Sequence, residues 1–183
     1  MAVSNIQPTY KRQRFLLALI RQLREGVTST DLQKLVFLYT MKENSRFYEF
    51  IPYKYGAYSF QLATDVDILR RNGYLSIDGF LIQAVGEYPP EVLFPIATER
   101  GDSLIRKAYR EYPYFAVNSE ISNRLFSGAE AEQYKHQKRY YAQTSQMLFT
   151  IGYEGKSIEA FMNTLIQNDI RLLCDVRKNP LSR

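Results

Sequence analysis

The sequence has little of what disulfides and metal centres require. Its 183 residues include one cysteine and one histidine. A single cysteine cannot form a disulfide within the chain, and one cysteine with one histidine is too small a ligand set for structural zinc. The sequence therefore predicts no metal site, and no pattern in it indicates a cofactor.

Long apolar runs and a targeting segment are missing as well. No run approaches the roughly 20 apolar residues that a transmembrane helix requires. Residues 1–8 have neither the basic start nor the apolar stretch of a signal peptide. We expect a cytoplasmic protein that has no membrane partner.

The sequence does contain enough material for one domain and the start of another. With 45% hydrophobic and 23% charged residues, it has the composition of an ordinary globular chain. A full domain of usual size takes about 130–145 of these residues. We expect an α+β protein with three parts, a module over residues 1–127, a polar helical connector over 128–146 and an incomplete unit over 147–183.

The net charge of +5 is located mainly in the first 28 residues. Five basic residues stand there against one acidic residue, whereas residues 29–146 contain fourteen of each. Lys11, Arg12 and Arg14 are therefore candidates for contacts with nucleic-acid phosphates. The alternative is that this basic helix face is simply solvated.

Apolar spacing predicts the first two helices of the module. Residues 10–25 and roughly 31–43 each repeat apolar residues at the i, i+3, i+4 and i+7 spacing of a helix. The run Thr28–Thr30 offers several caps for the second helix. Residues 47–55 are rich in aromatic and β-branched side chains, but Pro52 restricts them to an edge strand or a short extended connection.

A third helix and a hairpin complete this pattern. Ser59 can cap the third helix. After it, the dipeptide Asp78-Gly79 favours a two-residue type I′ turn between strands at 74–77 and 80–83. Helix, helix, extended segment, helix and hairpin is the order of a winged helix, so we expect a winged-helix-like module.

Further helices are expected before and within the connector. The patterns at residues 98–110 and 118–126 predict two of them. The connector carries basic residues interleaved with tyrosines, which can pair with phosphates and stack on bases. Its nucleic-acid candidates are Lys135, Lys138 and Arg139. Acidic residues offset much of this charge, so the alternative is a solvated helix between two domains.

Residues 147–183 follow a strand, helix, strand pattern that predicts a βαβ unit. Apolar runs near 147–152 and 171–177 flank an amphipathic helix. Two parallel strands need more strands and covering helices before they persist. We therefore expect the chain to stop inside a fold. The unit is then expected to pack on the N-terminal module or to assemble with a second copy of the chain.

Polar residues follow both expected strands, at the edge where open α/β sheets bind ligands. The helix that begins near Ser157 points its N-terminus there, and its N–H groups can bind an anion. The alternative is that Asp175 and Arg177 only pair around a strand end. The ligand-binding candidates are Tyr153, Glu154, Lys156, Ser157, Asp175 and Arg177.

Other reactive residues are given structural roles. Cys174 lies within an expected buried strand, which predicts an inert thiol. His136 has no serine or cysteine partner by spacing and is expected at the surface. Asp65 and Asp67 are two positions apart on a helix, so they point in different directions and cannot chelate one ion together.

The third helix and the hairpin argue against sequence-specific DNA binding. The helix carries two acids and two arginines, and the acids, Asp65 and Asp67, lie nearer its middle, where they would repel phosphates. The hairpin at 74–83 contains no lysine or arginine. The pattern therefore favours a DNA-binding shape that serves protein contacts.

Three segments of the module resemble the Panacea domain, the socA-like antitoxin family. They are Leu32–Tyr39 (LQKLVFLY), Phe50–Ser59 (FIPYKYGAYS) and Asp67–Leu75 (DILRRNGYL), within a likeness that covers about residues 10–85. Ala57 stands where the family pattern has proline. The resemblance implies a protein-interaction module that neutralises a toxin or acts as a proteolytic adaptor.

The C-terminal segment is similar to the opening of a second family, the domain of unknown function 488. The likeness rests on Thr150–Gly155 (TIGYEG), Asp175–Arg177 (DVR) and Asn179–Arg183 (NPLSR). The family pattern continues with a cluster of cysteine, glutamate, histidine and arginine that the 183 residues do not contain. The resemblance therefore implies an unfinished site, and we expect no enzymatic activity from this chain alone.

The function that the sequence favours is a regulatory or adaptor module that binds a protein partner, in a toxin–antitoxin or defence-like setting. One alternative is a regulator that binds nucleic acid, weakly and without sequence preference. Another is an enzyme that acts on a nucleotide or nucleic-acid substrate, with a site completed by further sequence. The sequence names neither the partner nor any catalytic residue.

Overall fold

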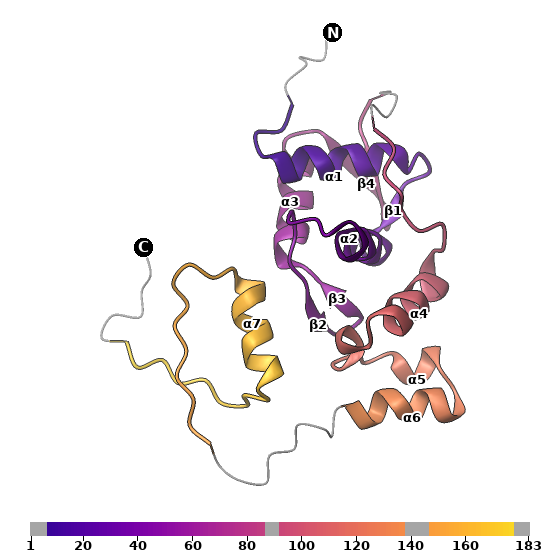
Figure 1. The fold of residues 1–183 in the computed structure, drawn as a ribbon. Helices are drawn as coiled ribbons and strands as arrows, with labels where there is room; N and C mark the ends of the chain where they lie inside the picture. The colour runs from indigo at the N-terminus through magenta and orange to yellow at the C-terminus, as the bar shows by residue number, and fades with distance from the viewer. Residues whose placement is uncertain (1–6, 87–91, 138–146, 178–183) are drawn as a thin grey trace.

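The computed structural model describes residues 7–86, 92–137 and 147–177, and it mixes helices with two small antiparallel sheets. This confirms the expected α+β class. Figure 1 shows the arrangement of the elements. The first eight are α1 (Lys11–Gln22), β1 (Val27–Thr28), α2 (Ser29–Glu43), β2 (Ile51–Tyr53), β3 (Gly56–Tyr58), α3 (Phe60–Arg71), β4 (Leu75–Asp78) and β5 (Leu81–Ala84).

The rest of the described chain is helical or irregular. Its elements are α4 (Gly101–Glu111), the 3-10 helix η1 (Pro113–Ala116), α5 (Ser122–Leu125), α6 (Gly128–Gln137) and α7 (Ile158–Gln167). Within residues 147–177, α7 is the expected helix, but the flanking segments do not form the two strands that the sequence predicts. A pair of parallel strands is stable only when further strands and covering helices pack against it, and the described residues contain no parallel strand that could extend such a pair.

Side-chain caps fix where two of the N-terminal helices begin. The Thr28 hydroxyl accepts a hydrogen bond from the Asp31 amide at 3.1 Å, so α2 begins at Ser29. The Ser59 hydroxyl accepts one from the Leu62 amide at 3.2 Å. Each cap satisfies an amide that has no acceptor inside the helix. The prediction of Ser59 as a cap is confirmed.

The three-stranded sheet has the order β1-β5-β4, with all pairs antiparallel. In the hairpin, Asp78 pairs with Leu81, so Gly79 and Phe80 form the two-residue loop. The predicted loop at Asp78-Gly79 was wrong by one position. Gly79 has a φ of +59°, whereas Phe80 is not among the described non-glycine residues with positive φ. That combination fits a type II′ turn, which needs glycine at its first central position.

A second, two-stranded sheet pairs β2 with β3. Pro52 lies in β2, which is an edge strand, as the sequence predicts. Gly56 begins β3 with a φ of +85°, and a Cβ atom there would lie 2.3 Å from the Tyr109 ring. Gly56 is therefore required both by its backbone conformation and by close packing against α4.

The core surrounds α2. Figure 1 shows this helix end on, with α1, α3, the strands and α4 around it. The predicted apolar faces of α1, α2 and α3 are confirmed, because each supplies fully buried side chains. These include Leu16, Leu19, Ile20, Leu32, Leu35, Val36, Leu62 and Leu69. Burial of each of these large side chains contributes about 1.5–3 kcal/mol, which makes the helical faces the main source of stability.

Asp65 ties α3 to α1 through a buried carboxylate that is 0% exposed. Its oxygens accept hydrogen bonds from Arg12 Nε at 2.6 Å, from the Gln13 side chain at 2.8 Å and from the Tyr48 hydroxyl at 3.0 Å. Asp65 was expected to lie where it would repel phosphates, but its carboxylate is directed into the module. Asp67, on the opposite face, is half-buried and pairs with Arg70 and Arg71.

The first part of the predicted connector packs into the core. Tyr134 of α6 is 4% exposed and stacks on Phe126 with ring centroids 4.6 Å apart. It also lies 6.0 Å from the Tyr109 ring. Tyr134 is therefore not available to stack on nucleic-acid bases, one of the two interpretations of the connector, because its ring is enclosed by other aromatic side chains.

The aspartates of α3 allow a matched test of this packing. Asp65→Ala leaves Arg12, Gln13 and Tyr48 without their buried acceptor, so we expect the free energy of unfolding to fall by about 3–5 kcal/mol. Asp67→Ala removes exposed ion pairs from the same helix and should cost at most about 1 kcal/mol. Urea unfolding of the two variants measures the difference, and equal losses would contradict the structural role of Asp65.

Candidate functional site

The predicted nucleic-acid residues of α1 are not equivalent in the structure. Lys11 and Arg14 are exposed. Arg12 is held by Asp65, and this ion pair raises the pKa of the Arg12 guanidinium. Lys138 and Arg139 lie outside the described residues, and only the backbone of Lys135 is described. The described part of the chain therefore presents two of the six candidates as accessible cations.

Part of the predicted strand-end cluster does come together. The Arg177 guanidinium donates to the Asp175 carboxylate at 2.8 Å and lies 4.9 Å from the centre of the Tyr153 ring. The hydrogen bonds from Arg177 lower the pKa of Asp175 to about 2. Both charges are thus directed at each other in an exposed segment, which is the pairing that the alternative interpretation predicts.

The other candidates in this segment have different positions. Glu154 and Lys156 are exposed. The Ser157 hydroxyl caps α7 by accepting from the Ala160 amide at 2.9 Å, and it also donates to the Glu49 carboxylate. Cys174 is exposed, so the prediction that a strand buries it was wrong. The side chain of His136 lies outside the described part of the structure.

Helix α7 docks on the N-terminal part through two polar side chains that sequence reasoning missed. Glu159 is 2% exposed, and its carboxylate accepts from the Ser59 hydroxyl at 3.2 Å and from the Gln61 amide at 2.9 Å. Asn163 donates to the Phe50 carbonyl at 2.7 Å and accepts from the Tyr114 hydroxyl at 3.1 Å. Glu159 therefore acts as a second cap on α3, supplied from about 100 residues away.

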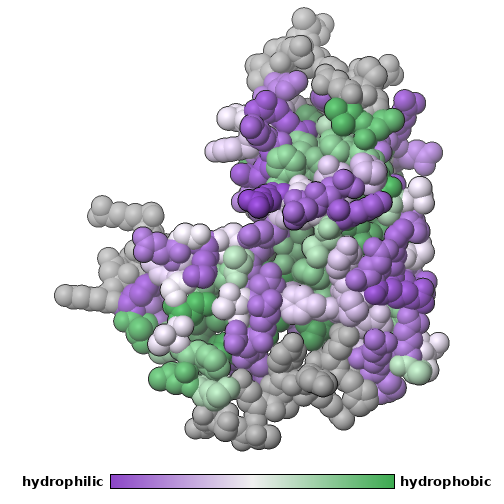
Figure 2. All heavy atoms as spheres, in the orientation of Figure 1, coloured by the Kyte–Doolittle hydropathy of each residue, from purple (hydrophilic) through white to green (hydrophobic). Residues whose placement is uncertain are grey.

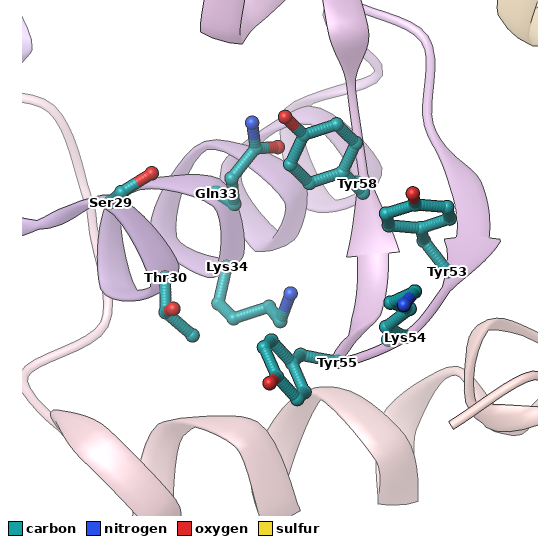
Figure 3. Close-up of a pocket in the computed structure, with 9 residues that line it drawn as sticks. Ser29, Thr30, Gln33, Lys34, Tyr53, Lys54, Tyr55 and Tyr58 are labelled. Atoms are coloured by element: carbon teal, nitrogen blue, oxygen red, sulfur yellow. The ribbon is translucent and has the colours of Figure 1, made fainter. Parts of the chain in front are cut away.

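The second feature that sequence reasoning missed is a cavity of about 260 Å³ between α2 and the β2–β3 hairpin. Figure 3 shows Lys34 reaching from α2 toward the hairpin, with the Tyr55 ring beside its ammonium end. The lining residues are Ser29, Thr30, Gln33, Lys34, Tyr53, Lys54, Tyr55, Gly56 and Tyr58. The sequence does contain one indication of this site, because Lys34 lies in α2 among the core residues Leu32, Leu35 and Val36.

The cavity places a buried ammonium among aromatic walls. Lys34 is 2% exposed, and its Nζ donates to the Ala57 carbonyl at 2.7 Å. Burial lowers the pKa of Lys34 to about 7, although the charge of nearby Asp31 opposes this change. Beside it, Gln33 holds the hairpin by exchanging two hydrogen bonds with the Ser59 backbone, at 2.9 and 3.0 Å. The site can therefore bind an acceptor or act as a neutral amine near neutral pH.

The described ranges contain no group of three histidine, cysteine or acidic side chains that could hold a metal ion. Nor does any helix in the described part of the chain have the length and hydrophobicity needed to span a bilayer.

The α7 contacts can be tested at single-amide resolution. Glu159→Ala removes the acceptor of the Gln61 amide, so that amide should exchange faster and the free energy of unfolding should fall by about 1–3 kcal/mol. Hydrogen exchange followed by NMR measures the first effect, with exposed Glu154→Ala as the control. Unchanged exchange at Gln61 in the Glu159 variant would show that α7 does not dock here in solution.

A pH series tests the buried state of Lys34. Because its folded pKa is below the ordinary 10.5, the unfolded chain binds more protons between about pH 7 and pH 10.5, and stability should rise with pH across that window. Lys34→Met removes this proton linkage, so we expect it to stabilise the protein by about 2–4 kcal/mol near pH 7 and by little near pH 10.

Urea unfolding at the two pH values measures this difference. Exposed Lys42→Met, on the same helix, provides the control and should show no pH-dependent gain. A Lys34→Met variant that loses the same stability at both pH values would contradict the burial of an ionisable amine.

Comparison with known proteins supplies no assignment for these sites. The chain matches no family model, no curated protein and no solved structure. Its function is therefore inferred from its own residues and geometry.

Proposed function

We propose that the N-terminal part of the chain is a winged-helix-like module that binds a protein partner through the β4–β5 hairpin. Its topology supports this interpretation. A short strand, β1, lies between the first two helices and pairs with β5 of the hairpin that follows α3. This is the arrangement in which a winged helix carries its wing, and it leaves β4 at the edge of the sheet.

The exposed apolar surface of the hairpin is the observation that carries the proposal. Phe80 at the loop is 89% exposed, and Ile77 and Leu81 beside it are 48% and 39% exposed. No lysine or arginine occurs between residues 74 and 84. A wing that contacts DNA needs cations for the phosphates, whereas aromatic and aliphatic anchors are typical of protein interfaces.

The charges of α3 favour the same conclusion. Asp65 is satisfied inside the module, and Asp67 pairs with both Arg70 and Arg71 on the outer face, which keeps one net positive charge. A recognition helix that enters the major groove presents free donors and cations to bases and phosphates. Here the two arginines are already paired with an acid of their own helix, so α3 has little net charge to offer.

The resemblance to the Panacea family supports a regulatory or adaptor role in a toxin–antitoxin or defence-like setting.

The C-terminal segment is consistent with the start of an α/β domain. Its apolar residues Leu148, Leu172 and Val176 are each at least 85% exposed, and Figure 2 shows hydrophobic surface on this part of the molecule, at the lower left. Further strands and helices would bury that surface.

Weak nucleic-acid binding is the second candidate. Exposed Lys11 and Arg14 on α1 favour it, since each can neutralise one phosphate. An enzymatic function has no comparable support in the described residues beyond the Lys34 amine.

Site-specific photocrosslinking tests the proposed function. A photoreactive phenylalanine analogue replaces Phe80 in one sample and exposed Met41, on α2, in another. We expect crosslinks to one protein from position 80 and none from position 41. The affinity of that protein is then measured by calorimetry, and Phe80→Ser should weaken it at least tenfold because the hairpin anchor is lost. Met41→Ser should leave it unchanged.

Two outcomes would contradict the proposal. One is equal affinity of the partner for Phe80→Ser and Met41→Ser. The other is crosslinking of position 80 to DNA. A crosslink to a second copy of the chain would instead identify the hairpin as a homodimer surface, which light scattering of the Phe80→Ser variant would verify as a loss of dimer mass.

A further inference from the structure

Lys34 has more donors than the protein uses. A lysine ammonium carries three N–H groups, and one of them donates to the Ala57 carbonyl. Within the described residues, no second hydrogen bond and no ion pair is found for this side chain. Two donors of a nearly fully buried cation therefore have no protein acceptor, and an unpaired donor of a charged group costs more than a typical unmade hydrogen bond.

The charged groups around the cavity do not supply the missing acceptor. Asp31, on α2, directs its carboxylate to the Gly101 amide at 2.8 Å. Lys54, at the rim, faces Glu120 at 3.6 Å. The tyrosines of the hairpin and Tyr109 of α4 are the other ionisable groups nearby, and burial raises the pKa of Tyr58 and of Tyr109. The cavity thus contains a cation without an anion.

The lining and the volume of the cavity indicate the chemical character and the size of a ligand that fits it. Tyr53, Tyr55 and Tyr58 present aromatic surface to the cavity. Ser29 and Thr30 are the first two residues of α2, and amides of a first helical turn have no acceptor within the helix and favour negative charge. The volume of about 260 Å³ is slightly below the roughly 300–1,000 Å³ of most small-molecule sites, so the ligand is small.

We propose that this cavity binds a carboxylate that carries a small aromatic or apolar group. One carboxylate oxygen pair can accept from the unsatisfied Lys34 donors, and the attached group then lies against the tyrosines. A single negative charge matches the single buried cation, whereas a phosphate dianion brings a second negative charge that no second buried cation of the lining balances. The site shares no residue with the β4–β5 hairpin, so this inference goes beyond the proposed protein-binding function.

Proton linkage gives the proposal a specific signature. A carboxylate binds the ammonium and not the neutral amine, so binding raises the pKa of Lys34 from its free value of about 7. The lysine is about 90% protonated at pH 6 and about 10% protonated at pH 8, which makes affinity fall about tenfold over that range. Histidine is the side chain that ordinarily titrates between pH 6 and pH 8, and no histidine lines the cavity.

The test uses 3-phenylpropionate as the probe and 3-phenylpropanamide as its uncharged match. NMR of protein labelled at the lysine ε-carbons follows the Lys34 titration with and without each compound. We expect saturating 3-phenylpropionate to raise the Lys34 titration midpoint by at least one pH unit, and the amide to leave it unchanged. No shift with the carboxylate, or the same shift with both compounds, would overturn the proposal.

Variants supply an independent measurement. Calorimetric titration at pH 6 should show at least tenfold weaker binding of 3-phenylpropionate to Lys34→Met, and unchanged binding to Lys42→Met. Equal affinity in the Lys34 variant and the wild type would overturn the proposal. Because the wild-type titration needs no variant, the inference can fail even if Lys34→Met does not fold.

The carboxylate has two possible sources, a small organic acid or the C-terminus of a peptide. A tripeptide that ends in phenylalanine, compared with its C-terminal amide, separates them. Binding of the free acid tripeptide with tyrosine ring shifts at the cavity identifies a peptide end. Binding of 3-phenylpropionate without binding of the tripeptide identifies a free organic acid, and binding of neither compound overturns the site.

Discussion

The carboxylate of Asp65 is the interaction on which the rest of the module depends. It lies at the point where α1, α3 and the segment before β2 meet, and it accepts hydrogen bonds from Arg12, Gln13 and Tyr48. A buried charge is stable only when it is paired and hydrogen-bonded, so these donors fix the direction in which α3 leaves α1. The direction of α3 in turn places the β4–β5 hairpin, because only residues 72–74 connect α3 to β4.

The ion pair between Arg12 and Asp65 also reduces the positive charge that the N-terminal segment can offer to nucleic acid. Arg12 is committed to Asp65, and the exposed arginines of α3 are committed to Asp67. Three arginines that the composition counts as available to phosphates are thus paired with acids of the module. The accessible surface at the hairpin is apolar, and a partner that binds there gains mainly from burial of Phe80, Ile77 and Leu81.

Helix positions could be predicted from the sequence because they rest on local rules. The apolar stripes of α1 to α3 and the Ser59 cap follow from spacing and from one hydroxyl. The hairpin loop was displaced by one residue, because both Asp78-Gly79 and Gly79-Phe80 suit a two-residue turn and the pairing register decides between them. The Lys34 cavity and the contact of Glu159 with Gln61 could not be predicted, since each joins residues that only the tertiary fold brings together.

The central claim is that Arg12, Arg70 and Arg71 are paired with acids of the module, so that the module favours a protein partner over nucleic acid. The salt dependence of binding to a duplex of about 20 base pairs measures this most directly, because each phosphate contact adds about −0.9 to the slope of log affinity against log salt. With Lys11 and Arg14 as the accessible cations of α1, the account predicts weak binding with a slope of about −2 or shallower. Submicromolar affinity at physiological salt with a slope of about −5 or steeper would contradict it.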